Sequence, residues 1–495
     1  MRKSILQIFG GNLFSKLLGL IREILTASLF GTGQVVGAFR IAQAGTLTPV
    51  NFLTGDILNA AFIPQYTQLR EQQQDSAQTL FWTLAAMFGG IALLLPSLLW
   101  WAAGRWVGVL APGVDTQTQE LAITMLRIMA VGIPFYLWSA LLAFLAMAHK
   151  DFGPMALRPV VQNLGMIAGA VLAVALGSVW FLAWGFTVSY VLLSGWTTWR
   201  ARRAGFLRFP DLWSWPQAGE VMRAFWRTLR PLVMLPFMLQ GNIVVERAVA
   251  SLVGLAAVSA LDYARFVSET LILLLSVPVA FAGLAHWSGL SGEAIRKRLE
   301  TVLRLLMAVS VPISAFLAVH AHTVVQAAYG RGAFDDESVR VTGDILQGTA
   351  VGLWAQVVGY VLLKALNAQM RNSAVLWVMG IALLANIAVN LGLHHQLGAM
   401  TLGLGSSAYG LILLGGCLTV LGLWKQVLPV AATMAIGCAG YMLLSHWLPT
   451  ADNVWRQLSI ACTAALFYWG LWVFLVPSLR KLLMDQIPKS WRTKF

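Results

Sequence analysis

Apolar residues occur along this chain in stretches of about 20, separated by short polar segments. A helix of about that length crosses the hydrocarbon core of a bilayer, which is about 30 Å thick. Strands of a membrane β-barrel would alternate apolar and polar residues over about ten positions, and these stretches do not alternate. The pattern therefore predicts an all-α polytopic membrane protein. We expect about fourteen membrane-spanning helices, at residues 4–30, 37–65, 79–109, 120–148, 154–177, 179–199, 228–254, 261–288, 301–327, 342–368, 373–393, 402–423, 427–447 and 455–477.

Lysine and arginine are concentrated in alternate loops of this predicted topology. They gather at the N-terminus, around Lys150 with Arg158 nearby, in segment 200–230 and in the C-terminal tail. Cytoplasmic loops of membrane proteins carry such an excess of cations, so both termini should lie in the cytoplasm. The same rule accounts for the net charge of +14 without a nucleic-acid partner. We expect a multi-pass protein of a bacterial inner membrane.

An internal repeat divides the chain. The segment that begins at Leu121 aligns without a gap on the segment near Val339, and Ala130-Val131-Gly132 falls on Ala350-Val351-Gly352, a shift of 350 − 130 = 220 residues. Six spans separate the copies, so both copies have the same orientation and should be related by an axis along the membrane normal. We expect an N-lobe at 1–200, a basic interfacial linker at 201–227, a C-lobe at 228–424, and two further spans with a basic tail at 425–495.

The sequence lacks the motifs of an ATPase or a hydrolase. It contains no GxxxxGK[ST], HExxH or GxSxG. The three cysteines, Cys417, Cys438 and Cys462, fall in apolar runs without disulfide or metal-site spacing. We therefore expect no enzyme activity and no cofactor other than a sodium ion, whose candidate ligands are described below.

Charged residues within the predicted spans are the informative set. A charge at the bilayer centre costs about 3 kcal/mol, so several charges together must line a polar cavity or pair across it. The cations are in excess, which suits an anionic ligand, and Glu23 should temper them or pair within the cavity. Arg265 and Glu269 lie one helical turn apart, so they could instead simply pair with each other. The candidate anion-binding residues are Lys16, Arg22, Arg40 and Arg265.

Two pairs of polar residues stand one turn apart on later spans. Asn386 and Asn390 share one face of a predicted helix, and so do Asn242 and Glu246. Amide oxygens and a carboxylate are hard ligands that suit Na⁺. Amides that bond between packed helices are the alternative explanation.

At these residues the chain resembles the MurJ/MviN family of lipid II flippases, in the MOP exporter superfamily. FSKLLGLIREILTASLFG at 14–31 resembles the first span of that family, and AAFIP, ERAVAS and GRGAFD resemble later segments. The resemblance implies an alternating-access transporter that moves an undecaprenyl-diphosphate-linked saccharide from the inner to the outer leaflet. We expect the protein to be a monomer. It also implies that the last two spans form a groove for the lipid tail.

The resemblance also implies roles for individual residues. Arg22 and Arg265 match arginines of the family and Lys16 replaces one, so these residues should bind the diphosphate together with Arg40. The implied sodium site comprises Glu246, Asn386, Asn390 and Ser406.

Two departures from the family pattern keep other functions open. Gly37-Ala38-Phe39 stands where the family has Asp-Ala-Phe, and VNFLTGD around Asn51 replaces paired arginines. A flippase for a lipid-linked exopolysaccharide or O-antigen-type repeat unit is one alternative. A cation-coupled drug antiporter of the same superfamily is another, and it should have an acidic cavity. A scaffold without transport activity would leave the buried charges without a purpose.

Overall fold

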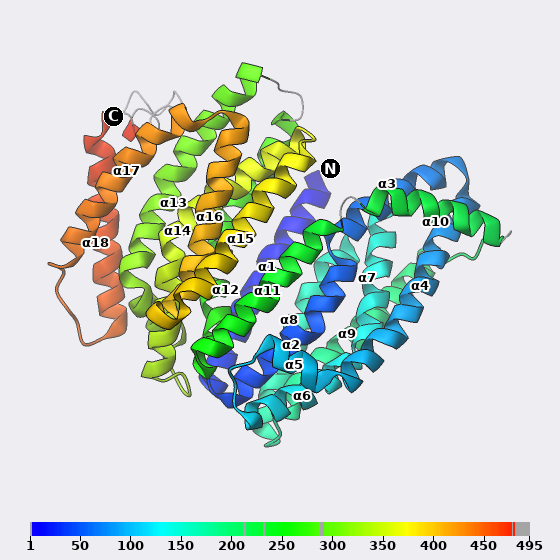
Figure 1. The fold of residues 1–495 in the computed structure, drawn as a ribbon. Helices are drawn as coiled ribbons and strands as arrows, with labels where there is room; N and C mark the ends of the chain where they lie inside the picture. The colour runs from blue at the N-terminus through cyan, green and yellow to red at the C-terminus, as the bar shows by residue number, and fades with distance from the viewer. Residues whose placement is uncertain (1, 211–213, 231–232, 288–291, 478, 481–495) are drawn as a thin grey trace. The chain divides into compact units, whose positions relative to one another are not determined.

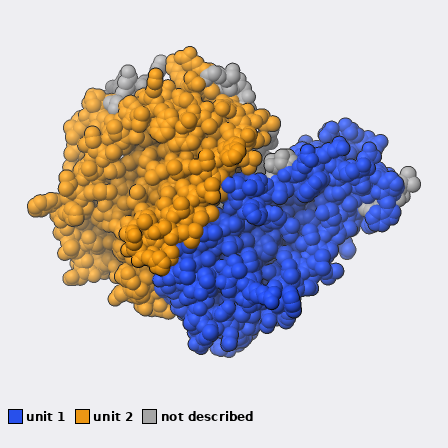
Figure 2. Space-filling model, in the orientation of Figure 1, with its two compact units in different colours: residues 1–259 blue, residues 260–495 orange. Residues whose placement is uncertain are grey.

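The structure is a computed structural model that describes residues 2–210, 214–230, 233–287, 292–477 and 479–480 (Figure 1). The described residues form eighteen α-helices joined by short loops, which confirms the predicted all-α fold. The predicted basic tail from residue 481 onward lies outside the described residues. The chain divides into two compact units, residues 1–259 and 260–495, coloured separately in Figure 2.

Unit 1 contains the first eleven helices and the start of the twelfth. These are α1 (Arg2–Phe30), α2 (Gln34–Thr54), α3 (Asp56–Gln72), α4 (Gln74–Trp101), α5 (Ala103–Leu110), α6 (Thr116–Ala130), α7 (Ile133–Ala148), α8 (Gly153–Ala175), α9 (Trp180–Arg203), α10 (Trp215–Leu229), α11 (Met234–Val253) and α12 (Leu255–Trp287). Unit 2 continues with α13 (Gly292–Tyr329), α14 (Asp336–Ala368), α15 (Asn372–Leu397), α16 (Met400–Leu421), α17 (Trp424–Ser445) and α18 (Val454–Leu475).

Each of the fourteen predicted spans coincides with helical structure. Eleven are single helices, whereas three are broken into the pairs α2/α3, α4/α5 and α6/α7. The first break falls at Gly55, whose backbone is extended at φ −65° and ψ 179°. By length and composition alone, nine helices of the described chain could each cross a membrane. The number rises to eleven if the two bent pairs α6/α7 and α10/α11 each form one span.

The linker helix α10 is amphipathic, as its sequence predicts. It packs on α3 and α4, where the Gln217 side chain donates to the Ser76 hydroxyl at 3.0 Å and Gln65 donates to the Val221 carbonyl at 3.4 Å. Trp215 and Trp226 remain 79% and 55% exposed. An amphipathic helix with exposed tryptophans is suited to the headgroup region of a membrane surface.

The predicted repeat appears as the same hydrogen bond in both units. In unit 1 the Thr187 hydroxyl donates to the Ile128 carbonyl at 2.9 Å. In unit 2 the Ser407 hydroxyl donates to the Gly348 carbonyl at 2.6 Å. Both residues of the pair shift by the same number, since 407 − 187 = 220 and 348 − 128 = 220.

Helix capping repeats with the same spacing. Asp115 caps α6 and Asp335 caps α14, and 335 − 115 = 220. The hydrogen bonds from the side chain and backbone of Thr118 lower the pKa of Asp115, and those of Ser338 lower the pKa of Asp335 in the same way. The two copies therefore share local structure as well as sequence.

Close backbone contact builds the centre of unit 2. Helix α14 packs most extensively against α16. A Cβ atom placed on Gly403 would lie 2.1 Å from the Ile345 carbonyl oxygen, so only glycine allows the two backbones to approach so closely. Small residues at such a crossing are the usual means of packing helices in a membrane.

Candidate functional site

A buried carboxylate joins two arginines inside unit 1. Glu23 on α1 accepts hydrogen bonds from Arg22 through one oxygen and from Arg40 of α2 through the other. Glu23 is 2% exposed and Arg40 4% exposed. The two guanidinium groups share one counter-charge, so the Arg22–Glu23–Arg40 cluster has a formal charge of +1. Glu23 therefore pairs with the neighbouring cations Arg22 and Arg40, and the cavity expected around them stays a prediction.

Arg22 also binds a side chain of helix α8. The Arg22 side chain donates to the amide oxygen of Asn163 at 2.8 Å. The amide nitrogen of Asn163 in turn donates to the Ser15 carbonyl on α1 at 3.0 Å. The buried Nε atom of Arg22 has no hydrogen-bond partner in the described structure. Arg22 is therefore held in a fixed position by Glu23 and Asn163.

The other predicted anion-binding residues are distributed over both units. Lys16 is partly exposed on α1, six residues before Arg22 and therefore about 120° away around the helix. Arg265 is partly exposed on α12, in the part of that helix that belongs to unit 2. The structure thus brings Arg22 and Arg40 together within unit 1 and places Arg265 in the other unit.

Arg158 was predicted to lie near the basic loop around Lys150. Because α8 begins at Gly153, Arg158 lies in its second turn. Its guanidinium lies 4.2 Å from the centroid of the Tyr136 ring on α7. The Tyr136 hydroxyl donates to the side-chain oxygen of Asn51 at 2.9 Å. Pro154 at the start of the helix was the available signal, since proline favours the first turn.

The predicted sodium ligands also fall in both units. Glu246 and Asn242 are buried on α11 in unit 1, and Asn386 and Asn390 are buried on α15 in unit 2. The Asn390 amide nitrogen donates to the Asn386 amide oxygen one turn earlier on the same helix.

Each of the two asparagine-containing pairs, Asn242/Glu246 and Asn386/Asn390, has a side-chain oxygen atom without a hydrogen-bond partner in the described structure, and such an oxygen suits a hard cation. The side-chain oxygens of Asn390 and Asn242 are buried without a hydrogen-bond partner in the described structure. Ser406 is a weaker candidate because its hydroxyl donates to the Leu402 carbonyl of its own helix at 3.4 Å. No group of three or more His, Cys, Asp or Glu side chains among the described residues could hold a metal. Asn242 and Glu246 in unit 1 offer oxygen donors of the kind a sodium ion binds, and Asn386 and Asn390 offer such donors in unit 2.

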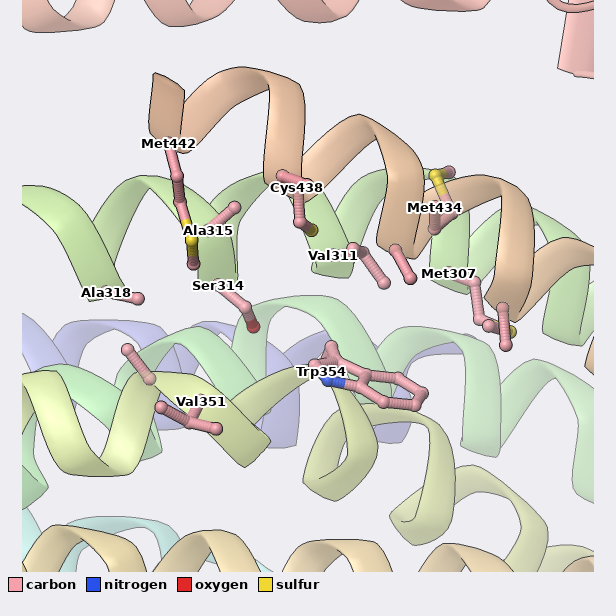
Figure 3. Close-up of a pocket in the computed structure, with 14 residues that line it drawn as sticks. Met307, Val311, Ser314, Ala315, Ala318, Val351, Trp354, Met434, Cys438 and Met442 are labelled. Atoms are coloured by element: carbon pink, nitrogen blue, oxygen red, sulfur yellow. The ribbon is translucent and has the colours of Figure 1, made fainter. Parts of the chain in front are cut away.

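An apolar cavity of about 370 Å³ lies within unit 2, between α13, α14 and α17 (Figure 3). Met307, Met434 and Met442 line it together with valine and alanine side chains. Ser314, whose buried hydroxyl has no hydrogen-bond partner in the described structure, is one of the few polar groups in the lining. Flexible methionines suit an apolar chain of irregular shape, whereas a diphosphate would lose its hydration here.

Comparison with known proteins gives a consistent result. The family model described as "Lipid II flippase MurJ" matches residues 26–444. A probable lipid II flippase MurJ from Synechocystis is 27% identical over 365 residues, which cover 69% of this chain and 66% of that protein. The match therefore spans slightly less than two thirds of that relative's length.

Solved structures share the fold. A lipid II flippase MurJ in an inward closed conformation gives a TM-score of 0.80 at 20% identity, and covers 94% of this chain and 98% of its own. An inward-facing multidrug resistance MATE family transporter of the MOP superfamily gives 0.66 at 14% identity, with coverage of 87% and 98%.

The ion arrangement around Glu23 predicts strong energetic coupling between Glu23 and Arg40. Glu23→Gln leaves two neighbouring buried cations without their shared counter-charge, which should destabilise the fold by about 3–5 kcal/mol. Removing one cation as well, in Glu23→Gln/Arg40→Gln, should recover a large part of that loss. Thermal unfolding of the purified variants in detergent measures this cycle. Strictly additive losses would contradict the buried bridge.

Proposed function

The chain belongs to the lipid II flippase MurJ family, and from that premise we propose that it carries lipid II, an undecaprenyl-diphosphate-linked saccharide, from the inner to the outer leaflet of a bacterial inner membrane. It is a transporter and not an enzyme. The observation that carries the proposal is the Arg22–Glu23–Arg40 cluster, which holds two guanidinium groups beside each other in an apolar protein, as binding of an anionic ligand would need.

The cost of burying these charges supports a ligand-binding role. Each exposed charge at the bilayer centre costs about 3 kcal/mol, and Arg22 and Arg40 both pair with the same carboxylate, Glu23. A phosphate group offers charge-assisted hydrogen bonds that are about twice as strong as neutral ones. The diphosphate of the substrate offers such bonds, and we assign Lys16, Arg22, Arg40 and Arg265 as its binding residues.

The apolar cavity of unit 2 suits the hydrocarbon tail of such a substrate. A lipid tail carries no polar groups, and burying it contributes about 25 cal/mol for each Å² of apolar surface. Helix α17, one of the two C-terminal helices, supplies Met434, Cys438 and Met442 to the cavity (Figure 3). We assign this cavity to part of the polyprenyl tail.

The charge of the cluster argues against the drug antiporter that the shared fold would also permit. A cationic drug needs an acidic cavity, and Glu23 is already neutralised by two guanidinium groups. Other lipid-linked saccharides carry the same diphosphate, so the cluster alone would serve them equally. Membership of the lipid II flippase family favours lipid II among them.

Topology and energy supply complete the proposal. The distribution of lysine and arginine supports a cytoplasmic location for both termini.

No nucleotide-binding motif is present in the sequence, so ion gradients or the membrane potential should drive the transport cycle. A sodium ion bound at Glu246, Asn386 and Asn390 would supply such coupling, as hard oxygen ligands allow.

Arg22 should be essential for transport. Arg22→Ala removes a guanidinium that we assign to diphosphate binding, so a strain depleted of its own lipid II flippase should not grow with this variant. Arg22→Lys should retain partial activity because it keeps the charge but loses the bidentate geometry. Arg105 is an exposed arginine that stacks on Trp101, and Arg105→Ala is the matched control that should complement fully. Full complementation by Arg22→Ala at normal protein levels would refute the assigned role.

Sodium should stabilise the purified protein. An ion that binds only the folded state raises the unfolding temperature by mass action, and Glu246→Gln should remove this response because it removes a formal negative charge. Glu269 is exposed on α12, and Glu269→Gln should keep the full response. Thermal unfolding in NaCl against choline chloride makes the comparison. The sodium site is wrong if Glu246→Gln responds to NaCl as the unaltered protein does.

A further inference from the structure

Asn163 connects the charged cluster to the rest of unit 1. Its side chain projects from the third turn of α8 and is 7% exposed. The amide oxygen accepts the hydrogen bond from Arg22 at 2.8 Å, and the amide nitrogen donates to the Ser15 carbonyl at 3.0 Å. Ser15 and Arg22 are seven residues apart, so they lie two turns apart on the same face of α1. One amide therefore fastens α1 at two points.

The two bonds determine which way round the Asn163 amide lies. A guanidinium has only donors, and a backbone carbonyl has only acceptors. Turning the amide over would bring its NH₂ group against Arg22 and its oxygen against the Ser15 carbonyl, so both bonds would be lost. Each end of the amide is thus engaged within the protein, which suits a residue that acts on Arg22 rather than on a ligand.

The backbone behind Asn163 is fixed by a close contact between α8 and α9. A Cβ atom placed on Gly165 would lie 2.7 Å from the Gly185 carbonyl oxygen, and one on Gly169 would lie 2.6 Å from the Phe181 carbonyl oxygen. Gly165 lies about 200° around the helix from Asn163, so the two residues are on opposite faces. Helix α8 therefore packs its glycine face on α9 and its Asn163 face on α1. Asn163 is a rigid support for Arg22.

A second residue of α8 contacts the same guanidinium. The Met166 sulfur lies 3.7 Å from the Arg22 nitrogen that also donates to Asn163. The Gln43 amide of α2 approaches that sulfur at 3.8 Å. A thioether sulfur is only a weak acceptor, so the bond to Asn163 is the stronger of these two contacts from α8.

We propose that Asn163 is a positioning residue for diphosphate binding, which holds the Arg22 guanidinium in the orientation that the phosphate meets. This inference rests on the proposed function and adds to it a residue outside the predicted set. A guanidinium matches a phosphate when its planar fork points at it, and a long side chain that is already ordered loses less conformational freedom on binding. Without Asn163, Arg22 keeps its charge and its bond to Glu23 but loses the strong bond at its other nitrogen.

The test is a double-mutant cycle on the binding of undecaprenyl diphosphate. Dissociation constants are measured on the purified full-length chain in detergent for the unaltered protein, Asn163→Ala, Arg22→Ala and the double variant. Asn163→Ala should weaken binding about fivefold, the effect of leaving one long side chain to be ordered by the ligand. In the Arg22→Ala background it should change binding less than about twofold, because the group that Asn163 positions is gone. The other assigned cations remain in Arg22→Ala, so its weaker binding stays measurable at higher lipid concentration.

A matched control separates positioning from packing. Gln78 is 4% exposed, and its amide donates to the Tyr66 hydroxyl at 3.1 Å, between α4 and α3 of the same unit. Gln78→Ala removes a buried amide bond away from the cluster and should leave the affinity unchanged. Should Asn163→Ala not fold, Asn163→Ser supplies the same comparison. A serine hydroxyl within a helix bonds to the carbonyl four residues before it, so it leaves no unpaired donor.

Three results would overturn the inference. If the unaltered protein binds undecaprenyl diphosphate and Asn163→Ala binds it equally well, the inference fails and the proposed function stands. If Asn163→Ala weakens binding by the same factor with and without Arg22, Asn163 acts on the fold or on the lipid directly and not through Arg22. If the unaltered protein does not bind undecaprenyl diphosphate, the proposed function fails and the inference falls with it.

Discussion

A single carboxylate, shared between two guanidinium groups in an apolar protein, is the interaction on which the rest of the account depends. Glu23 lets Arg22 and Arg40 remain charged where each alone would be expensive to bury. The bridge also connects α1 to α2, while Asn163 connects α1 to α8. The same bonds that satisfy the charges therefore hold three helices together around a positively charged point.

The structure offers both charged and apolar surfaces. Unit 1 carries the charged cluster, and unit 2 carries an apolar cavity of about 370 Å³. An amphiphilic substrate needs both kinds of surface, since its diphosphate and its hydrocarbon tail cannot share one environment. A transporter of this kind requires no catalytic group, which agrees with the absence of hydrolase and nucleotide motifs from the sequence.

The sequence allowed the helices and the repeat to be predicted because both depend on local patterns. Apolar runs reveal spans, and the 220-residue shift relates Thr187 to Ser407 and Asp115 to Asp335 in the structure. The breaks at Gly55 and Ala102 were not predicted, because packing rather than hydropathy decides where a span bends. The sequence predicted that Glu23 would pair with a cation but did not identify Arg40 as the partner. The contacts of Asn163 with Arg22 and of Tyr136 with Arg158 join segments that are distant in the sequence, so local patterns do not reveal them.

The central claim is that this chain moves lipid II across the membrane, and the leaflet in which lipid II resides tests it most directly. In cells where this chain is the only lipid II flippase, an externally added enzyme that cleaves lipid II reports the fraction in the outer leaflet. The account predicts that cleavage occurs while the chain is present and falls to background soon after its depletion, as lipid II accumulates uncleaved. Cleavage that persists unchanged after depletion would contradict the account.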